Sequence, residues 1–301
     1  MFFLNKLKQR LGRFMNEIRQ LLLANVLLTG RLLSQQLATK KNIQNLAEVE
    51  FKVFSQFGDD GIIQYFLQQL DITDKRFVEF GVENYLEANT RFLLMNNNWS
   101  GLVMDGSVKN VASIKDDEIV WRYDLQAVAA FISKENINAL LKDNGFAGEI
   151  GLLSIDIDGN DYWVWEAITV TSPILVIVEY NSIFGNERTV TVPYRPDFNR
   201  TKAHFSNLYW GTSLPALCAL AEIKGYNFIG SNSAGNNAYF VRKDKIGNLK
   251  PLSAKEGYVV SKFRDSRNEQ GDLSFLSGSE RLEKIKGMPI FNVISKETES
   301  L

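Results

Sequence analysis

Cysteine and histidine are nearly absent from this sequence of 301 residues, which contains one of each, Cys218 and His204. A single cysteine cannot form a disulfide within the chain, and one residue of each kind cannot build a Cys/His zinc site. Any metal ion would therefore need oxygen ligands, which magnesium, calcium and manganese prefer. Positive charge is not in surplus either, because 34 Lys and Arg residues face 35 Asp and Glu residues. This balance argues against nucleic acid as a partner.

Long apolar runs are also missing. No stretch approaches the roughly 20 consecutive apolar residues of a membrane-spanning helix, and the longest run, over residues 21–28, is interrupted by Asn25. A signal peptide is not indicated, because the positive region is too long and no small-x-small cleavage motif follows closely. With 45% hydrophobic and 23% charged residues, the composition is that of an ordinary globular protein. We expect a cytoplasmic location.

Residues 1–49 form a basic leader to an acidic body: residues 1–41 carry a net charge of +7 and the rest of the chain carries −8. Apolar residues in the leader recur at alternating steps of three and four, which predicts an amphipathic helix with a coiled-coil seam. The seam comprises Leu4, Leu7, Leu11, Phe14, Ile18, Leu21, Asn25, Leu28 and Leu32. Three interpretations stay open: a helix packed on its own body, a helix that joins subunits of a homo-oligomer, or a helix lying on the inner face of an anionic membrane.

Short apolar segments alternate with helical patterns between residues 50 and 243. We expect strands at residues 77–81, 102–105, 119–123, 150–157, 174–180, 226–230 and 238–242, and helices at 62–70, 87–96, from 125 to about 141, 162–168 and 214–224. This alternation predicts an α/β fold with a mostly parallel sheet and helices on both faces. The short link between the last two strands makes that pair antiparallel. Residues 244–301 are interpreted as a C-terminal extension, packed on or flanking the domain of residues 50–243.

Polar residues follow most of these strands, at the edge of an open α/β sheet where ligands bind. They are Gly81, Asp105, Asp124, Asp156, Asp158, Glu179 and Asn181. The first strand lacks the G-x-G-x-x-G phosphate cradle, which lowers the case for NAD. Asp105 lies 24 residues after Gly81, and a carboxylate there suits a ribose diol. A ribose site without a phosphate cradle suits S-adenosylmethionine (SAM).

Five segments resemble the motifs of FkbM-type methyltransferases, a branch of the class I SAM-dependent methyltransferases. They are residues 55–61 (SQFGDDG), 77–81 (FVEFG), 86–91 (LEANTR), 154–163 (SIDIDGNDYW) and 178–181 (VEYN). The resemblance covers residues 50–243 and implies a Rossmann-like sheet of seven mostly parallel strands, the last one antiparallel. It departs from the family in the first loop, where the usual second glycine is absent and Asn84 and Tyr85 stand instead.

The resemblance also implies the roles of the cofactor residues. Glu79 and Gly81 would flank the methionine part of SAM, Asp105 would hold the ribose, and Asp124 would accept from the adenine amino group. Asp156 would border the cofactor, and Gln56 could close over it together with Ser55.

The implied reaction is O-methylation of a sugar hydroxyl of a glycan or glycoconjugate, as in cell-surface polysaccharide biosynthesis. Asp158, Glu179 and Asn181 are similar in place to the magnesium ligands of the macrocin-type sugar O-methyltransferases. Magnesium could acidify the attacked hydroxyl. Without it, Asp156, Asp158 or His204 could act as general base.

The insert after the fifth strand is where this fold builds its acceptor pocket. It offers Tyr180, Arg188, Tyr194 and Trp210 as ligands for a sugar acceptor.

Two other functions stay open from the sequence. One is a metal-dependent glycosyltransferase that uses Asp156-x-Asp158 as its D-x-D pair, although it leaves Asp105 and Glu179 without a role. The other is a non-catalytic scaffold with a degenerate SAM pocket, which the missing glycine and the coiled-coil leader suggest.

Overall fold

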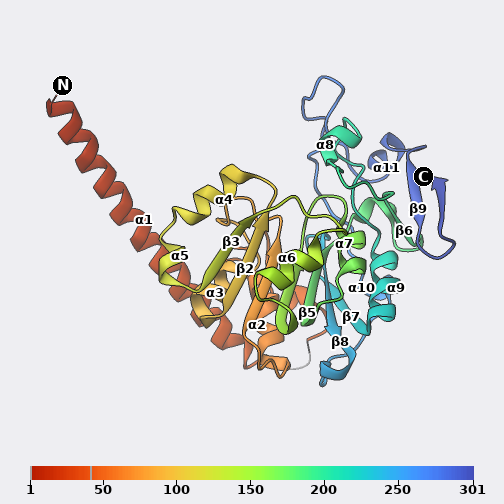
Figure 1. Ribbon diagram of the computed structural model, residues 1–301, viewed down its shortest axis with the longest axis horizontal. Helices are drawn as coiled ribbons and strands as arrows, with labels where there is room; N and C mark the ends of the chain where they lie inside the picture. The colour runs from red at the N-terminus through yellow and green to blue at the C-terminus, as the bar shows by residue number, and fades with distance from the viewer. Residues whose placement is uncertain (1, 41–42) are drawn as a thin grey trace.

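The computed structural model describes residues 2–40 and 43–301, with side chains from residue 6 onward except those of residues 7 and 9. Its centre is a seven-stranded sheet in the order β3-β2-β1-β4-β5-β8-β7 (Figure 1). Adjacent strands are parallel except that β8 is antiparallel to β5 and β7. This confirms the expected Rossmann-like sheet of seven mostly parallel strands, the last one antiparallel. The strands are β1 Arg76–Phe80, β2 Ser100–Asp105, β3 Leu125–Ala129, β4 Gly148–Ile155, β5 Thr171–Glu179, β7 Tyr226–Ser231 and β8 Asn237–Arg242.

Helices cover both faces of the sheet because its central strands are apolar on both sides. Every residue from Ile174 to Val178 on β5 is buried, as expected for a parallel strand between two helical layers. One core lies under α1 to α5 and the other under α6, α7 and α9. The helices are α1 Phe2–Leu37, α2 Asp59–Gln69, α3 Arg91–Asn97, α4 Val108–Lys115, α5 Ile119–Arg122, α6 Ile137–Asp143, α7 Asp161–Ala167, α9 Leu214–Lys224 and α10 Ala254–Gly257.

The third strand lies elsewhere than the sequence pattern indicated. Residues 119–123, predicted as a strand, contain the short helix α5, whose Ile119 is buried in the core. The true strand β3 follows it, at an edge of the sheet, with alternating burial. An edge strand needs only one apolar side, so its sequence LQAVA gave a weaker signal than the apolar run before it.

Helix α1 touches the body only with its carboxyl-terminal half, and its other half projects away (Figure 1). Gln20 donates to Glu118 at 2.9 Å and Gln68 donates to the backbone oxygen of Ser34 at 2.8 Å, while Leu37 is buried in the core. Packing on the body therefore accounts for part of the helix, not for its amino-terminal half. Among the described residues, no helix is both long and apolar enough to cross a membrane.

The insert after β5 and the C-terminal extension fold together above the carboxyl ends of the strands. A second sheet, in the order β10-β9-β6, joins the two segments, and the Tyr209 hydroxyl of the insert donates to the backbone oxygen of Pro289 in the extension. The extension also reaches the main domain, since the Tyr180 hydroxyl donates to the Val259 oxygen at 2.6 Å. The elements are β6 Val190–Thr191, α8 Arg200–Ala203, α11 Glu280–Lys284, β9 Pro289–Asn292 and β10 Glu297–Ser300, and the 3-10 turns are Leu46–Val49, Ser182–Phe184 and Lys243–Lys245.

Candidate functional site

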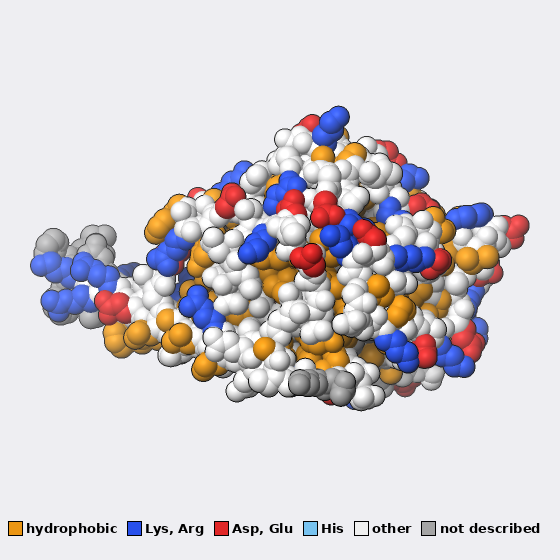
Figure 2. Space-filling model, turned by 90° about the horizontal axis from the view of Figure 1, so that it is seen from below, with side chains coloured by type: hydrophobic (Ala, Val, Ile, Leu, Met, Phe, Trp, Pro, Cys, Tyr) orange, Lys and Arg blue, Asp and Glu red, His pale blue; other side chains and the backbone are white. Residues whose placement is uncertain are grey.

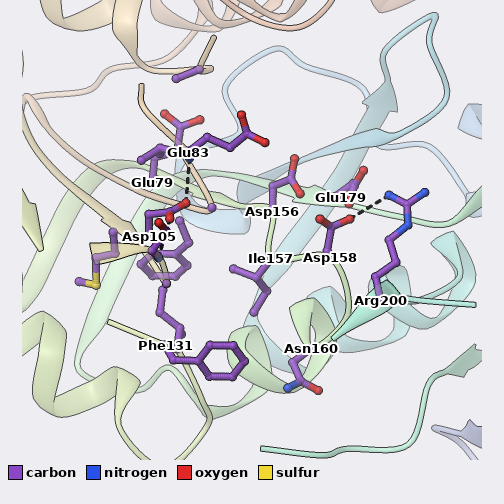
Figure 3. Close-up of a pocket in the computed structure, with 18 of the residues that line it drawn as sticks. Glu79, Glu83, Asp105, Phe131, Asp156, Ile157, Asp158, Asn160, Glu179 and Arg200 are labelled. Atoms are coloured by element: carbon purple, nitrogen blue, oxygen red, sulfur yellow. Dashed lines mark hydrogen bonds and ion pairs between the residues drawn. The ribbon is translucent and has the colours of Figure 1, made fainter. Parts of the chain in front are cut away.

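A cavity of about 640 Å³ opens at the carboxyl ends of β1, β2, β4 and β5 (Figure 3). Strand ends form its floor, and the insert and the extension form its roof. Most of the expected cofactor residues line it, namely Gln56, Glu79, Gly81, Asp105 and Asp156, together with the expected metal or catalytic residues Asp158 and Glu179. The structure thus brings together acids that lie up to a hundred residues apart.

Gly81 is required at the end of β1 for two reasons. Its φ is +72°, a conformation that side chains disfavour, and a Cβ there would lie 1.6 Å from the backbone oxygen of Asp156. Glu79, just before it, accepts from the backbone of Asn89 at 2.8 Å and of Thr90 at 3.0 Å. Burial raises the pKa of Glu79 to about 7. Glu79 therefore fixes the loop that borders the cavity.

Asp105 ends β2 and orders the neighbouring loops. Its carboxylate accepts from the backbone of Glu83 at 2.8 Å and of Ser107 at 2.8 Å, and from the Asn110 side chain at 3.1 Å. Since a carboxylate has about four acceptor positions, one remains for a ligand. The Glu83 carboxylate lines the cavity nearby (Figure 3).

The loop that lacks the second glycine still takes the conformation that glycine favours. Glu83 and Tyr85 have φ values of +48° and +61°. Tyr85 is fully buried, its hydroxyl lies 3.0 Å from the Thr90 hydroxyl, and Arg91 donates to its backbone oxygen at 2.8 Å. These contacts hold the loop in this conformation and offset the cost of the positive φ values, which a glycine would adopt without strain.

Three carboxylates converge where β4 and β5 end (Figure 3). Burial, then the charges of Asp158 and Asp161, raises the pKa of Asp156 well above its usual value. Burial, then the charge of Asp156, does the same for Glu179. Asp156 and Glu179 both line the cavity at the ends of neighbouring strands, and Oε2 of Glu179 is buried without a hydrogen-bond partner. The pair is suited to hold one proton and to accept a second.

Arg200, on α8, was not anticipated from the sequence, because an arginine in an irregular insert has no motif or strand end to mark it. Its guanidinium lies 3.0 Å from Asp158 and 2.9 Å from Asp265, and Nε donates to the Asn207 backbone oxygen at 2.7 Å. It also stacks 4.8 Å above the Trp210 ring. Arg200 therefore links the floor to the insert and the extension.

Asp161 helps to form the loop rather than to face the cavity. It accepts from the backbone of Ile157 at 2.9 Å and of Gly159 at 2.9 Å. Asp158, which lies between those two donors, has a positive φ of 56°. This geometry turns the Asp158 side chain toward Arg200.

Several predicted residues lie outside the cavity lining. The segment before Asp124 is a helix and not a strand, so Asp124 precedes β3 and lies at the opposite end of the sheet from the cavity. Its predicted adenine contact is therefore wrong. Residues 130–132 line the cavity beyond β3 in its place. Asn181, expected as a metal ligand, donates to the backbone oxygens of Leu208 and Trp210, both at 3.0 Å, and accepts from Ile183. His204 lies 2.7 Å from the Ser206 hydroxyl and stacks on Phe205.

The four expected acceptor ligands also have other contacts. Tyr180 is buried against the extension, Arg188 pairs with Glu299 at 3.0 Å, Tyr194 donates to Glu135, and Trp210 supports Arg200. None of the four lines the cavity. The insert supplies Asn199, Arg200, Thr201 and Asn207 instead.

No protein-family profile and no curated protein sequence matches this chain. Solved structures match at low similarity. The N-terminal domain of EvdMO1 with SAH bound is 12% identical, with 69% of this chain and 92% of that chain covered and a TM-score of 0.38. A SAM-dependent methyltransferase from Clostridium acetobutylicum ATCC 824 is 8% identical, with 61% and 90% covered and a TM-score of 0.40. The CurJ carbon methyltransferase is 8% identical, with 63% and 53% covered and a TM-score of 0.39. Likeness this distant carries no argument about activity.

Proposed function

We propose that this chain is a SAM-dependent O-methyltransferase that acts on a hydroxyl group of a sugar or glycan. The observation that carries the proposal is the charge of the cavity. Among the described residues that line it are eight acids and one cation, Arg200, which already pairs with two of the acids. The acids are Glu79, Glu83, Glu87, Asp105, Asp156, Asp158, Glu179 and Asp265. Such a cavity repels phosphate groups and favours a cationic ligand such as a sulfonium.

Three features of the cavity floor support a SAM site. Gly81 lines the cavity and lets the ends of β1 and β4 approach closely, because a Cβ there would lie 1.6 Å from the Asp156 backbone oxygen. Asp105 has one free acceptor position for a ribose hydroxyl, and Glu83 can supply another. Phe131, after β3, offers an aromatic ring on which a purine can stack, at the part of the site where the sequence had placed Asp124 as a hydrogen-bond acceptor for adenine.

Bound SAM supplies an electrophilic methyl group. An alcohol is a weak nucleophile at neutral pH, so the chain must provide a base. In the proposed reaction the acceptor oxygen gains the methyl group as the sulfur–methyl bond breaks, and the hydroxyl proton passes to the ionised carboxylate of the Asp156–Glu179 pair. Asn199, Thr201 and Asn207 offer hydrogen bonds at the roof, which suits an acceptor with several hydroxyl groups.

The residues do not fit the magnesium site that the sequence suggested. Among the described residues, no group of three His, Cys, Asp or Glu side chains is arranged to hold a metal ion. Asp158 pairs with Arg200, and the Asn181 amide is held by backbone groups. We therefore derive no step through a metal. The alternative of a metal-dependent D-x-D glycosyltransferase also loses support. Without a metal ion, the diphosphate of its nucleotide sugar would meet an acidic surface.

Calorimetry with the full chain tests the proposal. We expect SAM and SAH to bind and UDP-glucose not to bind. Asp105→Asn should weaken SAM about tenfold or more, because a charge-assisted hydrogen bond is lost, whereas Asp143→Asn, at the end of α6 outside the cavity lining, should not. SAH release during incubation with a panel of methyl glycosides then tests the acceptor class. UDP-glucose binding without SAM binding would overturn the proposal.

A further inference from the structure

One face of α1 is apolar and exposed to solvent. Seven of its large side chains are 56–66% exposed: Leu11, Phe14, Met15, Leu21, Leu22, Leu28 and Leu32. Figure 2 shows hydrophobic side chains gathered along one side of the projecting part of the helix. The exposed side chains include every described apolar residue of the predicted seam except Ile18, which is half-buried; the side chains of Leu4 and Leu7 lie outside the described part. The seam therefore does not pack on this chain's own body.

The exposed face lies on the side of the helix away from the body. Gly30 and Ser34 contact the body, and Leu23 and Leu27 are half-buried on the same side of the helix. At 3.6 residues per turn these four residues lie roughly opposite Leu11 and Leu28. A flat surface can therefore meet the apolar face without meeting the body. The full helix of 36 residues offers about 54 Å of length to such a surface.

Charge decides between the occupants of this face. Lys8, Arg10, Arg13 and Arg19 are exposed on α1, and Glu17 is the one acid in the helix. Two copies packed side by side in parallel would bring these cations together. The apolar face is also broader than the two positions per heptad of a coiled-coil seam, because it includes Met15 and Leu22, which lie beside the seam. An anionic lipid surface instead attracts each of these cations.

We propose that α1 docks this protein onto an anionic lipid surface, with its apolar side chains in the interface and its cations at the headgroups. The acidic body, with a net charge of −8 outside residues 1–41, would stay in the water above the helix. This attachment is independent of the methylation proposed above.

Vesicle flotation of the full chain tests the docking. We expect binding to vesicles of phosphatidylglycerol and phosphatidylcholine, and binding about tenfold weaker to phosphatidylcholine alone or in about 0.5 M salt. Leu22→Glu should reduce binding about tenfold or more, because it removes apolar area and adds a repelled charge. The matched control Asn16→Glu adds the same charge outside the apolar face and should stay within about fivefold of wild type.

Both positions are exposed, so each variant should keep the wild-type circular dichroism and thermal midpoint. Equal vesicle binding by wild type and Leu22→Glu would overturn the proposal. So would a stable oligomer in sedimentation that ignores vesicles and dissociates in Leu22→Glu, because a second copy would then cover the face.

Discussion

The floor and the roof of the cavity are held in different ways. The floor consists of strand ends, so its residues are fixed by the sheet and buried: Glu79 is 5% exposed and Asp105 is 8% exposed. Over the cavity, the roof meets the floor through the ion pair of Arg200 with Asp158, which is 59% exposed, and the second acid of the arginine, Asp265 of the extension, is 55% exposed. Exposed ion pairs contribute little free energy. The difference implies a rigid cofactor half and an adjustable acceptor half.

The largest effect is expected at the floor, from Gly81→Ala. The positive φ costs about 1 kcal/mol, and the clash with the Asp156 oxygen should bring the total to about 3 kcal/mol or more. Denaturant unfolding measures this loss, and calorimetry should show no SAM binding. The control Gly145→Ala has a φ of +84° and nothing within 4 Å of the added Cβ, so it should lose only the conformational part. Equal losses in both variants would show that the close approach at Gly81 is not rigid.

The same difference explains what the sequence could predict. The floor was accessible because a strand that ends in an acid is a local pattern, and parallel strands bring such ends to one edge. Asp105, Asp156 and Glu179 were placed at this edge for that reason. Asp124 failed because its location depended on which of two adjacent segments pairs with β2, a tertiary contact.

The roof was not accessible in this way. Arg200 and Asp265 lie 65 positions apart in irregular segments, and their meeting depends on how the extension folds onto the insert. The aromatic residues Tyr180, Tyr194 and Trp210 were expected to face the acceptor, but none of them lines the cavity and each has other contacts. No local period encodes that choice.

A second large effect is expected from Glu179→Gln. It removes one carboxylate of the proposed base pair, so turnover with a methyl glycoside should fall about 100-fold or more, while SAM affinity changes little because Asp105 and Gly81 are intact. The control Glu166→Gln, on α7 outside the cavity lining, should retain wild-type turnover. Turnover by Glu179→Gln near the wild-type rate would exclude the pair as the base.

Arg200→Gln should affect the roof alone. We expect KM for the methyl glycoside to rise about tenfold, because the lost charge frees both the insert and the Asp158 side chain, while SAM affinity in calorimetry stays unchanged. Arg195→Gln is the matched control, since Arg195 pairs with Asp197 within the insert and is 62% exposed. A loss of SAM affinity in Arg200→Gln would mean that floor and roof are one unit.

The floor should also respond to pH. Burial raises the pKa of Glu79 to about 7 and also raises the pKa of Asp156 and of Glu179, so the cavity becomes more negative as Glu79 ionises around pH 7. Cationic SAM should then bind more tightly relative to neutral SAH, by about threefold between pH 6 and pH 8. The free protein should lose stability over the same range, because raised acid pKa values make the folded state bind more protons than the unfolded state. A SAM-to-SAH affinity ratio independent of pH would contradict this account.

The smallest effect is expected from Asp265→Asn, which removes the extension's ion pair but keeps the partner of Arg200 on the floor. Asp265 is 55% exposed, so unfolding free energy should change by less than about 1 kcal/mol, and KM for the glycoside should rise about twofold to threefold. Comparison with Arg200→Gln separates the two links of the arginine: if Asp158 dominates, the two variants differ clearly, and if the extension dominates, they match. Matching values would place the adjustable contact between the insert and the extension, leaving Asp158 as part of the rigid floor.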